Sequence, residues 1–87
     1  MARSDFEKRF PSRASPALRT LARNVRQLRK VKGWTQDDLA EKANLEQTAV
    51  SLIENGRANP TVETLETIAI CLGVRFVDLF ESRPTKN

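Results

Sequence analysis

The fold is decided by the stretch TQDDLAEKANLEQTAVSLIENG, which occupies residues 35–56. Thr35 opens a pattern that resembles a capping box, because its hydroxyl can accept a hydrogen bond from the backbone amide of Asp38. Two acidic residues sit in the first turn, where the helix dipole favours negative charge. Asn44 tolerates a left-handed conformation, so the helix is expected to stop there and the chain to turn sharply.

A second short helix is predicted over about residues 47–55, with Val50 and Ile53 directed inward and Gly56 at its end. Two helices of about eight residues, separated by a turn of about three or four, are typical of a helix-turn-helix. In that motif the second helix can enter the major groove of DNA.

Apolar residues recur at helical spacing on both sides of this pair. One such stretch runs from Ala17 to about Gly33, and another follows Pro60 and ends at Gly73. The apolar positions of the two stretches are Leu18, Leu21, Ala22, Val25, Leu28, Val62, Leu65, Ile68, Ala69 and Leu72. A last apolar turn occupies residues 76–80. Because no segment alternates with period two, the sequence predicts an all-α domain of five helices, with the helix-turn-helix at the second and third.

Composition divides the chain into three parts. Residues 1–16 carry two prolines, three serines and several basic side chains, which is typical of a flexible, basic N-terminal arm. Residues 17–81 hold the helical patterns and form the predicted helix-turn-helix domain, and residues 82–87 form a polar C-terminal tail. A chain of 87 residues has room for one core.

Composition also excludes several classes of function. The chain has no His and a single cysteine, Cys71, so an internal disulfide is excluded and a zinc site lacks ligands. The usual general bases and nucleophile pairs are missing, so we expect no enzyme activity, no metal and no cofactor. No apolar run is long enough to span a membrane, and the charged first residues lack the apolar core of a secretory signal. A cytoplasmic location is therefore expected.

Positive charge is concentrated in the first third of the chain. Residues 1–33 hold ten basic and two acidic side chains, whereas the remaining residues hold five basic and nine acidic ones. The two parts carry +8 and −4, which together give the net charge of +4. Such a field attracts polyanions without choosing among them. Charge alone therefore leaves two alternatives, a nucleic-acid partner and a basic surface that is simply solvated.

The helical pattern resembles the phage repressor and Cro type (XRE family) of helix-turn-helix transcriptional regulators. The resemblance rests on Thr35-Gln36, Leu39-Ala40, Ile53-Glu54-Asn55-Gly56, Pro60, Leu65 and Ile68-Ala69. It extends over about residues 18–80. It implies a five-helix domain of the lambda-repressor type that binds a palindromic or pseudopalindromic operator on double-stranded DNA. Binding would be as a homodimer, with the third helix in the major groove.

The resemblance implies a role for each exposed position of the helix pair. Base edges would be contacted by Gln47, Thr48, Ser51, Gln36 and Ala49. Phosphates would be contacted by Thr35, Asn55, Arg57 and Arg29. A glutamine can pair with both edge atoms of adenine, and a threonine offers a hydroxyl together with a methyl group for thymine. The alternative for each position is an ordinary solvated helix face or loop.

Other side chains are given structural roles. Glu54 is expected to form an ion pair with Arg29 inside the domain, as the family's pattern implies. Trp34 is expected to pack at the junction of the first two helices, and Cys71 to be a buried small side chain. Glu46 departs from the family's pattern, in which a small hydroxyl residue commonly caps the third helix, and phosphates would repel its charge.

Dimer contacts are expected in the C-terminal third, where the apolar side chains exceed the needs of a minimal core. The candidates are Phe76, Val77, Leu79 and Phe80. Two alternatives to a DNA-reading homodimer remain open. One is an antitoxin-type regulator that binds a toxin protein as well as its operator. The other is a protein-interaction module that has kept the fold and lost DNA binding. The sequence is silent on a polymerase contact.

Overall fold

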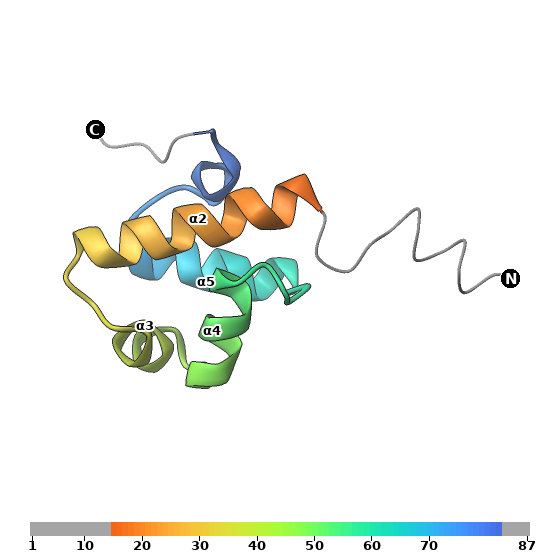
Figure 1. Ribbon diagram of the computed structural model, residues 1–87. Coiled ribbons are helices and arrows are strands. Elements are labelled where there is room, and N and C mark those ends of the chain that lie inside the picture. The colour runs from red at the N-terminus through yellow and green to blue at the C-terminus, as the bar shows by residue number, and fades with distance from the viewer. Residues whose placement is uncertain (1–14, 83–87) are drawn as a thin grey trace, which may run out of the picture.

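The structure, a computed structural model, describes residues 15–82 (Figure 1). Its elements in chain order are α2 (Pro16–Val31), α3 (Gln36–Ala43), α4 (Gln47–Glu54), α5 (Val62–Leu72) and the 3-10 helix η1 (Phe76–Phe80). Between residues 15 and 82 there is no strand, so the predicted all-α class is confirmed. The predicted arm (1–16) and tail (82–87) lie almost wholly outside the described residues.

α2 begins at Pro16, one residue earlier than predicted, because Ser15 caps it. The backbone amide of Leu18 donates to Ser15 Oγ at 3.2 Å. Pro16 occupies the first helical position, where its missing N–H leaves no hydrogen bond unmade. At the other end, Arg29 and Lys30 bring positive charge to the last turn, which the helix dipole favours.

The capping box predicted at the start of α3 is present. The Asp38 amide donates to Thr35 Oγ1 at 3.0 Å, and the Thr35 amide donates to Asp38 Oδ2 at 2.8 Å. Hydrogen bonding of the Asp38 carboxylate to Thr35, chiefly from the Thr35 backbone amide, holds the pKa of Asp38 below its usual value. At the other end, Asn44 has φ 57° and ψ 46°, the left-handed conformation expected from the sequence.

The fifth predicted helix is a short 3-10 helix. The backbone amide of Asp78 donates to the Arg75 carbonyl at 2.9 Å, a bond that spans three residues. The Arg75 amide donates in turn to Asp78 Oδ2 at 2.8 Å, so the acidic side chain closes the first turn. Arg75 and Glu81 are extended, which confines the element to five residues. The periodicity of apolar residues could not distinguish this tighter turn from an α-helix.

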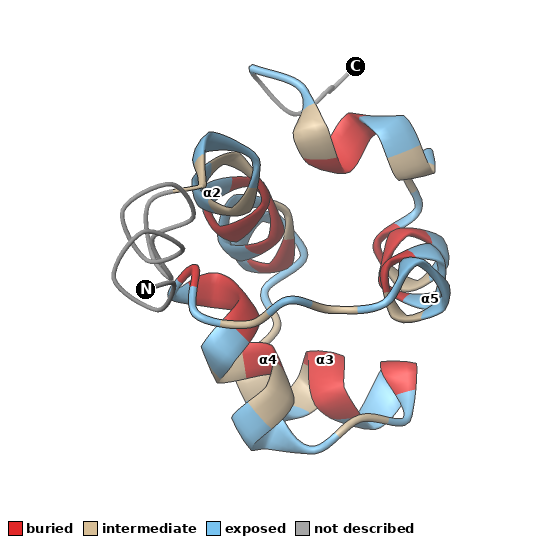
Figure 2. Ribbon diagram, turned by 90° about the vertical axis from the view of Figure 1, so that its right-hand side faces the viewer, coloured by how far each residue is buried: buried red, intermediate tan, exposed pale blue. Residues whose placement is uncertain are grey.

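An apolar core lies where the five elements meet. Figure 2 shows the buried residues on the inward sides of the helices. The core consists of Leu21, Val25, Leu39, Ala40, Ala43, Val50, Ile53, Leu65, Ile68, Ala69, Leu72 and Leu79. α2 packs against α4 and η1, whereas α5 packs against α3 and η1. The helix-turn-helix is therefore supported from two sides.

η1 is attached to α2 by a buried asparagine. Asn24 has no exposed surface, and its Nδ2 donates to the carbonyls of Leu79 at 2.9 Å and Glu81 at 2.8 Å. Leu79 itself is fully buried in the core. The prediction that Leu79 lies at a dimer interface is therefore wrong, because its side chain is already covered within one chain.

Trp34 and Cys71 lie at the edge of the core. Trp34 packs partly buried at the junction of α2 and α3, as predicted. The ammonium groups of Lys32 and Lys42 lie 5.3 and 4.9 Å from the centre of its ring, within range of a cation–π contact. Cys71 is half-buried rather than buried, and its thiol donates to the Lys42 carbonyl at 3.3 Å.

Candidate nucleic-acid interface

The turn between α3 and α4 sets the direction of α4. The Leu45 amide donates to the Ala40 carbonyl at 2.8 Å across the left-handed Asn44, and the Leu45 side chain packs against the core. Ala40 is buried where the two helices meet. These contacts hold α3 and α4 as a helix-turn-helix, with the first residues of α4 at the outer edge of the molecule (Figure 1).

α4 has a buried face and an exposed face. The buried side chains are Val50, Ile53 and Glu54. The exposed or half-buried side chains are Gln47, Thr48, Ala49, Ser51 and Leu52. Every position on α4 for which the resemblance implies a base contact therefore lies outside the core. Leu52, which is 42% exposed, was not among the predicted contacts.

A chain of hydrogen bonds joins the domain interior to the start of α4. Arg29 donates through Nε to Glu54 Oε2 at 2.6 Å and through Nη2 to Glu54 Oε1 at 2.9 Å. Gln36 Nε2 donates to Glu54 Oε1 at 3.1 Å, and Gln47 Nε2 donates to Gln36 Oε1 at 2.6 Å. The exposed glutamine of α4 is thus connected through Gln36 to a buried ion pair.

Glu54 is charged within this series of hydrogen bonds, although its side chain has no exposed surface. Burial raises its pKa, but hydrogen bonds from Arg29 and Gln36, with the positive charges of Arg29 and Arg26, outweigh burial and hold the pKa below its usual value. The hydrogen bond to Glu54 raises the pKa of Arg29. The ion pair expected from the sequence is therefore present, and it is bidentate and buried.

The structure contradicts the prediction that Arg29 also contacts a phosphate. Its side chain is only 10% exposed. Nε and Nη2 are engaged by Glu54, and Nη1 donates to the Trp34 carbonyl at 2.8 Å. Arg29 consequently links α2, the α2–α3 junction and α4, and its charge is neutralised inside the domain.

The predicted contacts at the start of α3 and α4 lie together. One surface hollow is lined by Arg29, Trp34, Thr35, Gln36, Asp37 and Gln47. Thr35 is exposed and Gln36 half-buried. An amide side chain has two N–H groups and two acceptor lone pairs, so Gln47 can hold Gln36 and still offer hydrogen bonds outward.

Asn55 and Arg57 lie beyond the other end of α4. Asn55 Nδ2 donates back to the Ser51 carbonyl at 2.7 Å, which caps the helix end. The Arg57 amide donates to the Leu52 carbonyl at 2.9 Å, and the Arg57 side chain is exposed. The Arg57 side chain is therefore accessible from outside, whereas the amide of Asn55 is already engaged in an internal hydrogen bond.

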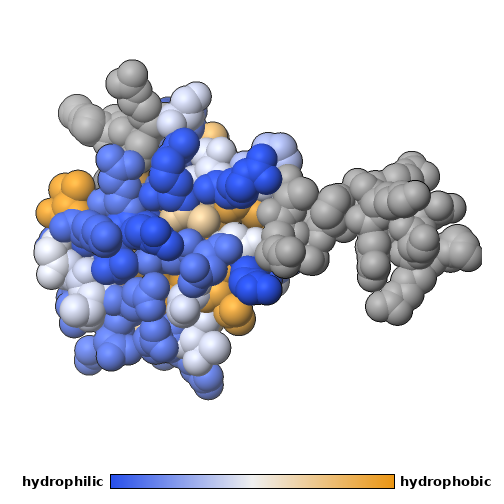
Figure 3. Space-filling model, viewed as in Figure 1, coloured by the Kyte–Doolittle hydropathy of each residue, from blue (hydrophilic) through white to orange (hydrophobic). Residues whose placement is uncertain are grey.

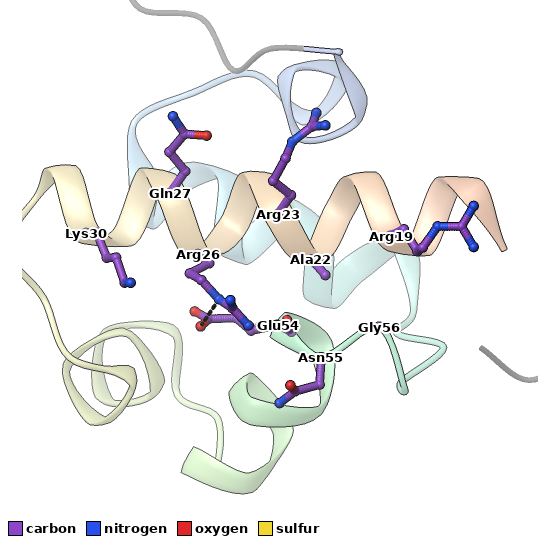
Figure 4. Close-up of a pocket in the computed structure, with 9 residues that line it drawn as sticks. All are labelled: Arg19, Ala22, Arg23, Arg26, Gln27, Lys30, Glu54, Asn55 and Gly56. Atoms are coloured by element: carbon purple, nitrogen blue, oxygen red, sulfur yellow. Dashed lines mark hydrogen bonds and ion pairs between the residues drawn. The ribbon is translucent and has the colours of Figure 1, made fainter. Parts of the chain in front are cut away.

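A basic groove that the sequence pattern did not predict lies between α2 and the end of α4. Its lining includes Arg19, Arg26 and Lys30 from α2 with Asn55 and Gly56 from the end of α4. Figure 4 shows Arg26 and Lys30 directed from α2 toward the helix-turn-helix, while Arg23 points toward η1. Figure 3 shows hydrophilic side chains gathered over this side of the molecule.

Arg26 connects the basic groove to α4. Its Nη2 donates to the Glu54 carbonyl at 3.0 Å, and its Nε lies 3.8 Å from Glu54 Oε1. About half of the side chain remains exposed. Residues 19, 26 and 30 are spaced by seven and four, so they share one helix face. That spacing was visible in the sequence, but nothing local indicated that the face borders α4.

The similarity of this chain to known proteins agrees with this geometry. A protein-family model described as helix-turn-helix matches residues 25–79, from the second half of α2 into η1. The chain belongs to this family. The helix-turn-helix match is of the phage repressor and Cro (XRE) type, a class of DNA-binding transcription regulators and not of enzymes.

Two relatives of this helix-turn-helix protein illustrate the class. It is 41% identical over 56 residues to the immunity repressor protein of Bacillus phage phi105, a match that covers 64% of this chain and 39% of the repressor. It is 43% identical over 56 residues to the HTH-type transcriptional regulator y4dJ of Sinorhizobium fredii, covering 64% and 73% of the two chains. The chain thus matches well under half of the phage repressor.

A solved structure is similar as well. The restriction-modification controller protein C.Esp1396I, a tetramer in complex with its natural 35 base-pair operator, is 39% identical. It matches with a TM-score of 0.69 over 76% of this chain and 87% of its own. The names of these three proteins refer to repression, regulation and an operator, and none refers to a toxin or a polymerase. Among the described helices of the present protein, none could cross a membrane.

Proposed function

We propose that this helix-turn-helix protein regulates transcription by binding a palindromic or pseudopalindromic operator on double-stranded DNA as a homodimer. α4 would lie in the major groove. The observation that carries the proposal is the exposed face of α4, whose first residue is connected through Gln36 to the buried Arg29–Glu54 pair. An interface that is held in place before binding loses less freedom on association.

The base-contacting side chains would be Gln47, Thr48, Ser51, Gln36 and Ala49. Gln47 is suited to adenine because a glutamine can bond to both its N6 and N7 atoms, and Thr48 can meet a thymine methyl group or a polar base edge. Gln36 would support Gln47 and reach the backbone beside it, since the two amides are joined at 2.6 Å. Ala49 is half-buried and would contribute only a methyl contact at the margin.

Phosphate contacts would flank α4 at both ends. Thr35 lines the surface hollow at the start of α3 and α4. Asn55 and Arg57 follow the end of α4. The basic groove adds Arg26 and Lys30, which line it together with Asn55. Such contacts release counterions and strengthen binding to any DNA, so they would set affinity and salt dependence rather than sequence preference.

The homodimer would form through the C-terminal part, on the side of α5 and η1. Ile70 is 78% exposed and Val77 49% exposed. Ile70 and Phe76 line a shallow groove together with Glu66, Ala69 and Val74. With Leu79 assigned to the core, the predicted candidates reduce to Phe76, Val77 and Phe80, and Ile70 joins them. The tetrameric operator complex of the 39% identical controller protein supports an oligomer on DNA.

Selection of binding sites from random double-stranded DNA tests the proposal. We expect enrichment of two inverted half-sites, separated by about one helical turn or a multiple of it, with two chains per site in sedimentation. Specific sites should bind at least about a thousandfold more tightly than random DNA. A pool without an enriched sequence would refute sequence-specific regulation.

The same assay distinguishes side chains that contact bases from side chains that contact only phosphates. Gln47→Ala should lower the preference for the selected site by about 1–3 kcal/mol per half-site, because a bidentate base contact is lost. Arg57→Ala should weaken binding to selected and random DNA alike and reduce the salt dependence by about one phosphate. Equal losses on both DNAs for Gln47→Ala would remove its assignment as a base contact.

A further inference from the structure

Three backbone carbonyls at the end of η1 converge on two adjacent side chains of α2. Asn24 Nδ2 donates to the carbonyls of Leu79 at 2.9 Å and Glu81 at 2.8 Å. Arg23 Nη2 donates to the carbonyl of Glu81 at 3.3 Å and also to that of Ser82. The last carbonyls of a helix have no donor within the helix. For η1 that donor is supplied by α2, from more than fifty residues away in the sequence.

Arg23 also fixes the orientation of Asn24. Its Nε and Nη2 donate to Asn24 Oδ1 at 3.2 and 3.1 Å, which leaves Asn24 Nδ2 directed at η1. The guanidinium is planar and presents its donors as a rigid fork, so one arginine can hold the amide and the carbonyls together. Figure 4 shows Arg23 directed toward η1, whereas Arg26 points toward α4. Arg23 therefore acts on the end of η1 both directly and through Asn24.

η1 depends on such external contacts because it is short. It has five residues, and its hydrogen bonds span three residues, a geometry poorer than that of an α-helix. The Glu81 amide, which follows η1, donates to the Asp78 carbonyl at a long 3.4 Å. Leu79 anchors the element in the core, and the two side chains of α2 hold its end.

The outer face of η1 carries apolar side chains. A 3-10 helix has three residues per turn, so Val77 and Phe80 share one face, and Phe76 and Leu79 share the next. Val77 is 49% exposed and Phe80 is half-buried. The rings of Phe76 and Phe80 lie 5.8 Å apart between centroids. A small rotation of η1 would therefore change which apolar surface it presents outward.

We propose that Arg23 is a positioning residue for self-association: it fixes the end of η1 on α2, so that Val77 and Phe80 face a second copy of this chain in one orientation. The inference rests on the proposed function, in which the homodimer forms on the side of α5 and η1. A two-fold interface uses the same surface on both copies, so a loose η1 would have to be ordered twice on association. That ordering consumes free energy that the contact would otherwise contribute to affinity.

The dissociation constant of the dimer in Arg23→Ala tests this inference, measured by sedimentation of the full-length protein without DNA. It should rise by about tenfold to a hundredfold, the effect of ordering roughly one more backbone residue in each copy. Arg23→Lys keeps the charge but loses the planar fork, so its dimer should have intermediate affinity. Hydrogen exchange of the Glu81 amide in the monomer should speed up in Arg23→Ala, because the chain at this amide is no longer held on α2.

Two matched variants separate positioning from general effects. Ser15→Ala removes the N-terminal cap of α2, about 12 Å along the helix from Arg23, and destabilises the domain without touching η1. Its melting temperature and that of Arg23→Ala should both lie within about 8 °C of the parent. Lys32→Ala removes an exposed positive charge just beyond α2. Neither control should change the dissociation constant or the exchange of the Glu81 amide.

The outcomes distinguish this inference from the proposed function. If the parent dimerises and Arg23→Ala dimerises equally well, the inference is refuted and the homodimer stands. If Ser15→Ala weakens the dimer as much as Arg23→Ala, the loss follows overall stability and the inference is again wrong. A parent that stays monomeric with and without DNA removes the homodimer and the inference together. Dimers that select no DNA sequence refute the proposed regulator, whereas the effect of Arg23→Ala on those dimers still decides the inference.

Discussion

Helix α2 carries a buried polar side chain toward each of two neighbouring regions, and the two connections end in different places. Arg29 pairs with Glu54, and from there hydrogen bonds continue through Gln36 to the exposed Gln47. Asn24 donates to the carbonyls of Leu79 and Glu81, and its Oδ1 accepts from the exposed side chain of Arg23. The first connection reaches the surface of α4, whereas the second joins α2 to η1 and to the residues that follow it.

The two buried polar side chains of α2, Arg29 and Asn24, therefore have different roles. A buried group must be bonded in either case, because an unpaired one is costly. The chemistry of the partner decides what else it does. A carboxylate accepts several donors at once, so Glu54 can bind Arg29 and orient Gln36 together. Asn24 instead bonds to backbone carbonyls and to the exposed Arg23 of its own helix, and none of these bonds is made to α4.

The largest effect is expected from breaking the ion pair. Glu54→Ala leaves the Arg29 guanidinium buried without its partner and should lower the free energy of unfolding by about 3–5 kcal/mol. It should also reduce operator preference in the folded fraction, since Gln36 loses its acceptor. Urea unfolding and a binding assay at low temperature measure the two effects.

Two variants control this experiment. Glu41→Ala removes an exposed acid from α3 and should change stability by no more than about 0.5 kcal/mol. Arg29→Met combined with Glu54→Leu removes both charges and should recover much of the stability while leaving the binding defect. A Glu54→Ala protein as stable as Glu41→Ala would show that the pair does not stabilise the domain.

A smaller loss of stability is expected when the hydrogen bonds of Asn24 are removed. Asn24→Ala removes the donor to the Leu79 carbonyl and leaves the Glu81 carbonyl with Arg23 alone, and it should lower the free energy of unfolding by about 1–3 kcal/mol. Operator preference per folded protein should stay unchanged, because the connection does not reach α4. Asn59→Ala, at an exposed loop position, serves as the matched control for loss of an asparagine. A loss of operator preference comparable to that of Glu54→Ala would abolish the distinction between the two regions.

The smallest change in the free energy of unfolding is expected when the pH is lowered into the mildly acidic range. The folded-state pKa of Glu54 lies below its usual 4.5, so the unfolded chain takes up a proton more readily than the folded one. Glu54 therefore contributes stability above pH 4.5, and this is lost as the pH falls through the folded-state pKa. Asp38, whose pKa is also lowered, adds to the loss in the same direction. Unfolding measured across this range should show a weaker acid dependence for Glu54→Gln than for the parent, and identical curves would contradict the lowered pKa.

The local part of the structure follows from the sequence. Thr35 and Asp38 form the capping box, and Asn44 takes the left-handed conformation, as their residue types predict. The ends of α3, α4 and α5 agree with prediction to within about one residue, the margin that assignment allows. Each of these features depends on interactions between residues at most about four apart, which a single sequence displays directly.

The remaining predictions failed where contacts join distant positions. Leu79 was expected at an interface and is in the core, because η1 folds back onto α2 through Asn24. Arg29 was expected at a phosphate and is occupied by Glu54 and the Trp34 carbonyl. The basic groove and the exposure of Leu52 were overlooked, because the orientation of a helix face depends on what packs behind it.

The four α-helices, the capping box of α3, the helix-turn-helix and the family can therefore be recognised from the residue pattern alone. These depend on local hydrogen bonds, turn residues and the period of apolar positions. Which polar side chains stay exposed depends instead on tertiary packing. Arg29 and Arg26 carry the same charge on the same helix, yet the first is neutralised in the interior and the second is half-exposed beside α4. Tertiary packing determines this difference, because Glu54, to which both arginines bond, lies more than twenty residues away in the sequence.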